Sequence, residues 1–216
     1  MLKIHSLQAG LPATYEKDDG MGGTRPWRTA IFKRPVNGPV RATLLGLEGD
    51  GQADKRFHGG PDKALNAFCF EHYAFWAKEF CRDVLPPGAF GENLTLDGAL
   101  EADACIGDVF DAAGVRLQIS QPRQPCGTLA RRWETADLVQ RVEKQGSTGW
   151  YFRVLHEGFL KAGDELKLIE RANPKWTVSA ANDVMHFRKG GAKAAHELAQ
   201  LGALSEAWRE TLGRRK

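Results

Sequence analysis

The chain has 216 residues, of which 42% are hydrophobic and 26% charged, and its formal net charge at pH 7 is +3. This length can bury a hydrophobic core without disulfides, and the small net charge gives no argument for a nucleic-acid partner. No apolar run reaches 18 residues, which excludes a membrane-spanning helix, and the N-terminus lacks a signal-peptide pattern. We therefore expect a cytoplasmic protein with four reduced cysteines.

The first two-thirds of the sequence alternate short apolar runs with turn residues, a pattern typical of β-strands. The 24 glycines and 10 prolines favour tight turns between them. We expect strands over 2–7, 27–32, 40–47, 63–70, 93–96, 115–120, 149–160 and 164–170. Strands of this length and spacing indicate a small barrel or sandwich.

Two helices interrupt these strands. Over residues 71–80, aromatic side chains recur on one face of the expected helix. The second helix begins with Thr135 as its N-cap and ends at Gly146.

A break at residues 173–174, Asn-Pro, divides the chain into a β domain, 1–171, and a helical domain, 172–216. Three short helices are expected after the break. Ser179 caps the first, which runs to about Arg188, the second covers 192–201, and Ser205 caps the third, which ends near Gly213. This tail makes only a small core, so we expect it to pack on the β domain or on a second subunit in a homodimer.

The stretch QPRQPCGTLARR, residues 121–132, holds a cysteine between prolines and arginines. The prolines keep the approach extended, and a helix can begin just after Cys126. A helix start and nearby guanidinium groups lower a thiol pKa. The motif predicts either a thiolate that binds a soft metal or attacks a substrate, or a buried cysteine in a turn. For Cys69, Cys81 and Cys105 we expect structural roles, and we expect no zinc knuckle built on a Cys-x-x-Cys or Cys-x-x-His pair.

A second candidate is the glycine- and aspartate-rich stretch 48–64. It holds His58, Gly59, Gly60, Asp62 and Lys63. The spacing of a calcium-binding EF-hand loop is absent. One interpretation is a loop whose backbone N–H groups and lysine receive an anion. In the other, the aspartates cap turns and the glycines supply positive φ angles.

Two weaker candidates lie elsewhere. In FGENL, residues 90–94, a turn that enters a strand can present Glu92 and Asn93 to a cleft. Near the N-terminus, Lys33 is one of several basic residues that can meet a phosphate or can form a solvated face.

In combination, these stretches resemble MOSC-domain proteins, a family named after the C-terminal domain of molybdenum-cofactor sulfurases. The resemblance rests on LEGDGQADKRFHGGPDKAL, EHYAFWAKEF, FGENL, IGDVF, SQPRQPC and GW in this order, and is to the bacterial YiiM subfamily. It implies a β-barrel like the barrel domain of pyruvate kinase, flanked by helices. The tail resembles the small three-helix domain of YiiM-type proteins.

The resemblance also implies an activity. Related proteins use the molybdenum cofactor to reduce N-hydroxylated small molecules, such as 6-hydroxylaminopurine, with electrons from a separate flavoprotein. It makes Cys126 the metal ligand, which agrees with the preference of soft metals for thiolates. We assign proton transfer to His58 and Asp62, and cofactor binding to Lys33, Gly59, Gly60, Lys63, Glu92, Asn93 and Arg123.

Two other functions stay open. Cys126 can carry the cofactor, or sulfur as a persulfide, without turnover. The chain lacks a ferredoxin-type cysteine cluster, which fits either a carrier or a reductase with a separate electron donor. A barrel that binds nucleic acid is less favoured, because the basic residues are scattered and no aromatic RNA-binding motif occurs.

Overall fold

The computed structural model describes residues 1–18, 20 and 22–216. Its largest element is an eight-stranded sheet. The strands are β1 (Lys3–Ala9), β4 (Arg34–Pro35), β7 (Leu65–Cys69), β8 (Leu94–Asp97), β9 (Val109–Ala112), β10 (Val115–Pro122), β11 (Trp150–His156) and β13 (Lys167–Glu170). Their order is β13-β9-β10-β11-β7-β8-β1-β4, and all neighbours are antiparallel except β7 and β8.

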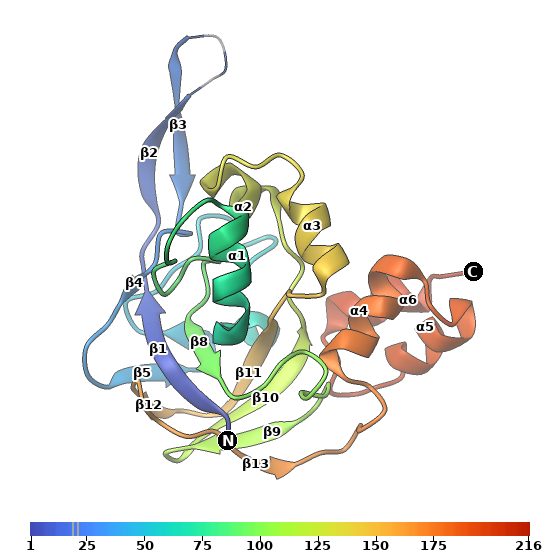
Figure 1. The fold of residues 1–216 in the computed structure, drawn as a ribbon. Helices are drawn as coiled ribbons and strands as arrows, with labels where there is room; N and C mark the ends of the chain where they lie inside the picture. Colours follow the sequence, from blue (N-terminus) through green and yellow to red (C-terminus); the bar gives the residue numbers. More distant parts are fainter. Residues whose placement is uncertain (19, 21) are drawn as a thin grey trace.

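The sheet curls strongly into a half-barrel, as Figure 1 shows. The segment that leads into β13 meets the beginning of β1, where Leu166 N donates to Leu2 O at 2.8 Å and Ile4 N donates to Asp164 O at 2.9 Å. The prediction of a mainly β, barrel-like fold with surrounding helices is confirmed.

Two smaller sheets complete the β structure. One contains β5 (Val40–Thr43), β6 (Gly46–Leu47) and β12 (Gly158–Leu160), and the other is the hairpin of β2 (Ala13–Asp18) and β3 (Thr24–Thr29). The hairpin projects away from the body of the molecule (Figure 1). The expected strand 40–47 is wrong in detail because an exposed turn at Leu44 and Leu45 splits it.

The helices surround the half-barrel. They are η1 (Pro61–Lys63), η2 (Phe70–His72), α1 (Tyr73–Glu79), α2 (Gly127–Arg132), α3 (Leu138–Gln145), α4 (Val178–Phe187), α5 (Gly191–Ala199) and α6 (Glu206–Gly213). The Ser205 cap is confirmed, since its side chain accepts from Trp208 N. Two caps are wrong. Thr177 rather than Ser179 caps α4, and α3 begins after Asp137, beyond Thr135.

The core has two parts. The larger fills the curled sheet and continues among α4, α5 and α6, so Trp208 and Leu212 belong to the same apolar cluster as Ile119 of β10. The smaller is rich in aromatic residues and joins α1, α2 and α3 to the base of β3; Phe68, Trp76 and Phe90 lie at its centre. The tail thus packs on the half-barrel, as expected.

Among the described residues, no helix is both long enough and apolar enough to cross a membrane.

Candidate functional site

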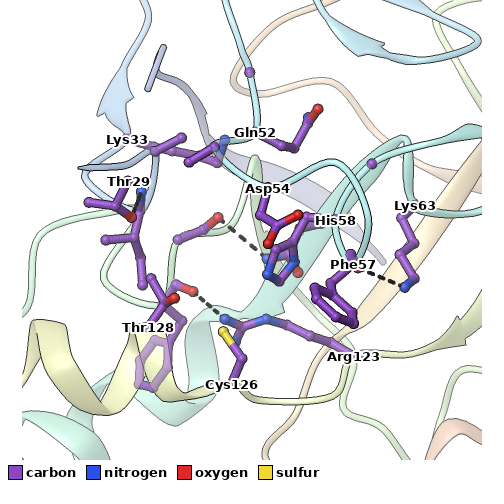
Figure 2. A pocket seen from close by; sticks show the side chains of 18 of the residues that line it. Thr29, Lys33, Gln52, Asp54, Phe57, His58, Lys63, Arg123, Cys126 and Thr128 are labelled. Carbon is purple, nitrogen blue, oxygen red and sulfur yellow. Dashed lines mark hydrogen bonds between the residues drawn. The ribbon is translucent and has the colours of Figure 1, made fainter. Parts of the chain in front are cut away.

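A cavity of about 590 Å³ lies beside the aromatic core. Its walls come from residues 27–33 at the base of the hairpin, 50–63, 90–93, and 121–128 between β10 and α2. Figure 2 shows polar side chains from several of these segments pointing toward one space. The fold therefore brings all four candidate stretches of the sequence to one place.

Cys126 lies in this cavity at the beginning of α2. Its backbone is extended, with φ −128° and ψ 165°, as is usual for the residue that precedes a helix. Burial alone would raise the pKa of its thiol, but a hydrogen bond with His58, the positive charge of Arg123 and the backbone N–H of Thr128 outweigh burial and lower that pKa to about 6. At neutral pH the side chain is therefore mainly a thiolate, the form that binds metals and attacks electrophiles.

The loop before η1 places His58 next to this thiol (Figure 2). His58 N donates to Asp54 O at 3.1 Å, which closes a turn. The next residue, Gly59, has φ +86°, and a Cβ there would lie 2.8 Å from Gln52 Oε1. The left-handed backbone favours glycine at this position, whereas the flexible Gln52 side chain could move away from a Cβ.

Arg123 is the second group that acts on Cys126. It is only 5% exposed, and its Nη2 donates to Phe90 O at 2.7 Å. Its backbone N donates to Gly149 O at 3.1 Å. Arg123 is thus held by one backbone and one guanidinium hydrogen bond, with its guanidinium group beside the sulfur (Figure 2).

Three buried polar atoms in the cavity wall have no hydrogen-bond partner among the described residues. They are Asn66 Oδ1, Gln121 Oε1 and Arg123 Nη1. Buried polar atoms are rarely left without a partner, because an unmade hydrogen bond costs about 1–3 kcal/mol. Two acceptors and one donor in one wall indicate a polar ligand that both donates and accepts hydrogen bonds.

The charges of the wall favour an anion. Five basic side chains line the cavity, namely Arg28, Lys33, Lys63, Arg123 and Arg131, against the two carboxylates of Asp50 and Asp54. Asp50 already pairs with Lys33, both nearly buried, and Asp54 pairs with Arg56 outside the lining. Net positive charge remains, of the kind that attracts phosphate groups.

Most of the predicted residues line this cavity. Cys126, His58, Lys33, Gly59, Lys63, Asn93 and Arg123 do so. Asn93 also supports the wall, because its Oδ1 accepts from Asn66 N at 3.1 Å.

Three predicted residues lie outside the lining. Gly60 begins η1 with φ +81°. Glu92 is fully buried behind the wall, where its carboxylate accepts from Tyr73 Oη and from the backbone N–H groups of Gly88 and Phe90. Asp62 turns toward the tail, where its Oδ2 accepts from Glu206 N of α6 at 3.1 Å, and its Oδ1 accepts from Arg153 Nε of β11 at 2.9 Å. Glu92 therefore shapes the FGENL turn, and Asp62 joins the loop to the tail.

The sequence analysis missed other residues of the wall. Gln121 lies inside the QPRQPC motif, so its position gave a signal that was not used. Arg131 lies in the same stretch of residues 121–132, whose guanidinium groups were noted but not assigned to a wall. Asn66 and Tyr151 belong to strands β7 and β11, and nothing local marks these two residues. Only the folded chain brings them to the thiol.

Two family models match this chain. Residues 54–167 match the MOSC domain, and residues 176–216 match the YiiM-like 3-alpha helix domain. The first match contains Cys126, His58 and Arg123, and the second covers α4, α5 and α6.

Individual relatives agree with these matches. Protein YiiM of Escherichia coli is 37% identical over 190 residues, which cover 87% of this chain and 84% of that protein. The crystal structure of YiiM from Geobacillus stearothermophilus is 34% identical, with a TM-score of 0.81, and covers 100% of this chain and 99% of that one. A protein named reductase from Gibberella moniliformis is 34% identical over 176 residues, 80% of this chain but only 31% of that protein.

Proposed function

Because this chain belongs to the MOSC-domain family and carries a YiiM-like three-helix domain, we propose that it is a molybdenum-cofactor-dependent reductase of N-hydroxylated small molecules. The observation that carries the proposal is the Cys126 thiol, whose pKa of about 6 is set by His58 and Arg123 in a cavity with excess positive charge. The reductase name of the Gibberella moniliformis relative supports the reaction class.

The residues of the cavity fit this cofactor. A thiolate is the soft ligand that molybdenum needs from the protein. Asn66 Oδ1 and Gln121 Oε1 are acceptors without partners, suited to the N–H groups of a pterin, and Arg123 Nη1 is a matching donor. Lys63 and Arg131 supply positive charge for the phosphate of the cofactor. A cavity of about 590 Å³ is within the range of small-molecule sites.

When bound, the cofactor supplies the two-electron chemistry that an N–O bond cleavage requires. Conversion of an N–OH group to N–H and water also consumes two protons. His58 is the titratable side chain next to the Cys126 sulfur, so we assign it to holding and delivering a proton at that point. Arg123 favours the ionised form of Cys126 by its positive charge, and its own hydrogen bond to Phe90 O fixes the position of that charge.

The electrons come from a second protein in this proposal. We infer a flavoprotein donor, as the resemblance to YiiM-type proteins implies. The competing function is a carrier of the cofactor or of persulfide sulfur, which the ionised thiol also favours.

The test is turnover of 6-hydroxylaminopurine by cofactor-loaded protein with reduced methyl viologen as an artificial electron donor. We expect turnover by the unchanged chain and by Cys81→Ala, which removes an exposed cysteine outside the cavity, and loss of turnover in Cys126→Ala. Turnover by a loaded Cys126→Ala variant would remove this thiol from the mechanism. A loaded, inactive wild type that passes its cofactor to an acceptor protein would establish the carrier function instead.

A further inference from the structure

A second cluster of metal-ligating side chains lies outside the cavity. It consists of Cys69 at the end of β7, His72 at the end of η2 and Glu101 in the loop after β8. One potential ligand atom of each side chain lies within 4.8 Å of the other two. None of the three lines the cavity, so the proposed reductase function does not use them.

The carboxylate of Glu101 is the centre of this cluster. It is only 4% exposed, and Cys69 is fully buried. His72 Nε2 lies 2.8 Å from Glu101 Oε2, while Gly149 N donates to Glu101 Oε1 at 2.7 Å. The sulfur of Cys69 also contacts this carboxylate. Three chemically different donors therefore converge on one buried point.

The charges around the cluster favour a cation. Glu101 is almost completely buried, and its ion-pair partner among the described residues is His72, which carries a positive charge only when protonated. No lysine or arginine in the described part of the chain pairs with it. Burial and the negative charges of Glu101, Glu71 and Asp103 raise the pKa of the Cys69 thiol. A buried carboxylate needs a positive partner, and the surrounding negative charge would attract one.

The donor set selects the kind of cation. Sulfur, imidazole nitrogen and carboxylate oxygen together suit Zn²⁺, whereas Mg²⁺ and Ca²⁺ prefer oxygen ligands alone. Cys69 and His72 are also spaced as Cys-x-x-His, a common arrangement of zinc ligands. The sequence analysis assigned Cys69 a structural role and did not recognise this pair.

We propose that Cys69, His72 and Glu101 bind one Zn²⁺ ion, with a water molecule in the fourth position. The thiol releases its proton to solvent as the sulfur–zinc bond forms, and the ion replaces the hydrogen bond between His72 and Glu101. The site would tie β7 and η2 to the loop that follows β8. Through Gly149, it would also support Arg123, whose backbone N donates to Gly149 O.

The test is zinc binding by the full chain after dialysis against a chelator. The protein is incubated with zinc chloride, desalted and analysed for zinc, in parallel with Cys69→Ser and His72→Gln. We expect one zinc per chain in the wild type, a higher unfolding temperature when zinc is present, and loss of both effects in the two variants. Cys105→Ser is the matched control, because Cys105 is also buried but lies outside the cluster.

X-ray absorption at the zinc edge keeps the proposal testable if the variants fail to fold. We expect one sulfur neighbour and otherwise nitrogen and oxygen. Absence of stoichiometric zinc, or equal binding by Cys69→Ser, would overturn the proposal. So would loss of zinc in Cys126→Ser alone, which would place the ion at the cavity thiol. Because these measurements use neither molybdenum nor turnover, they are independent of the proposed reductase function.

Discussion

The chemistry of Cys126 depends on opposing effects at a single residue. Burial disfavours the charged thiolate, whereas His58, Arg123 and the backbone N–H of Thr128 favour it and prevail. A thiol with an ordinary pKa would be mostly protonated at neutral pH and would have to lose a proton before it could bind a metal. In the proposed function, the cavity would thereby prepare this sulfur to bind the metal.

The first prediction concerns this pKa. The alkylation rate of Cys126 by iodoacetamide, measured in a Cys81→Ser background, should rise with pH with a midpoint near 6. Below that pH the thiol becomes protonated and its reaction slows. His58→Ala should move the midpoint upward because the hydrogen bond is lost, while His156→Ala, at an exposed position outside the cavity, should not. A wild-type midpoint above pH 8 would contradict this account.

The buried pair of Lys33 and Asp50 leads to a second prediction. Their side chains are 8% and 2% exposed, and Asp50 Oδ1 also accepts from Gly10 N at 2.9 Å. Lys33→Ala would leave a buried carboxylate without its cation, so we expect the free energy of unfolding in urea to fall by about 3–5 kcal/mol. The control, Arg56→Ala, breaks an exposed ion pair and should change the free energy of unfolding very little. If Lys33→Ala and Arg56→Ala lowered the free energy of unfolding by the same small amount, the buried pair would not contribute to stability as proposed.

At the scale of elements, the loop that carries His58 is held by the tail. Asp62 Oδ1 accepts from Arg153 Nε at 2.9 Å, and its Oδ2 accepts from Glu206 N of α6 at 3.1 Å. Ser120 Oγ donates to Asp62 O at 2.5 Å. In this structure Asp62 is a positioning residue for the loop rather than a wall residue of the cavity.

The third prediction tests that positioning. Asp62→Ala should lower the free energy of unfolding by about 1–3 kcal/mol, because charged hydrogen bonds are lost in a partly buried region. It should also raise the midpoint pH of Cys126 alkylation, because His58 is no longer held beside the sulfur. The control, Asp97→Ala, breaks the exposed pair with Lys3 and should change neither quantity appreciably. An unchanged alkylation profile in Asp62→Ala would argue against any role in positioning.

Sequence patterns predicted the elements that are buried or that end at a clear breaking residue such as glycine. β7 was expected because its apolar run is continuous, and the end of α3 because Gly146 adopts a left-handed backbone. β2 was missed because almost all of its side chains are exposed, so no apolar alternation marks it. The choice of Thr177 over Ser179 as a cap could not be made, since both are hydroxyl residues at suitable positions.

The residues of the site also fall into those that the sequence could predict and those that it could not. Cys126, His58, Arg123 and Lys63 lie in short motifs whose local chemistry is unusual, and the sequence analysis found them. Asn66 could not be found, because it is one polar residue in an otherwise apolar strand and becomes important only when β7 meets the loop before β8. The roles of Glu92 and Asp62 also depend on which way each side chain turns, which a linear motif does not specify.

Over the whole molecule, the tail and the half-barrel share one apolar core. Trp208 of α6 is 1% exposed and belongs to the same cluster as the interior of the sheet. Ser205 N also donates to Ser120 O of β10 at 2.9 Å. The two regions matched by separate family models are therefore joined by packing as well as by the chain.

The fourth prediction follows from this shared core. Calorimetry should show a single unfolding transition for the whole chain, because neither part buries its apolar surface without the other. Trp208→Ala should lower the free energy of unfolding by about 3–5 kcal/mol and keep one transition. The exposed Phe187 of α4 is the matched control, and Phe187→Ala should have a small effect. Two separate transitions would mean that the tail folds independently.

The proposed ligation of molybdenum by Cys126 can be tested by molybdenum analysis of the purified protein. Wild type, Cys126→Ser and Cys81→Ser are each co-expressed with the genes for cofactor biosynthesis and analysed for metal and for protein. The account predicts molybdenum in wild type and Cys81→Ser and its loss from Cys126→Ser. Equal molybdenum in Cys126→Ser, or none in wild type under conditions that load a known molybdenum enzyme, would contradict it.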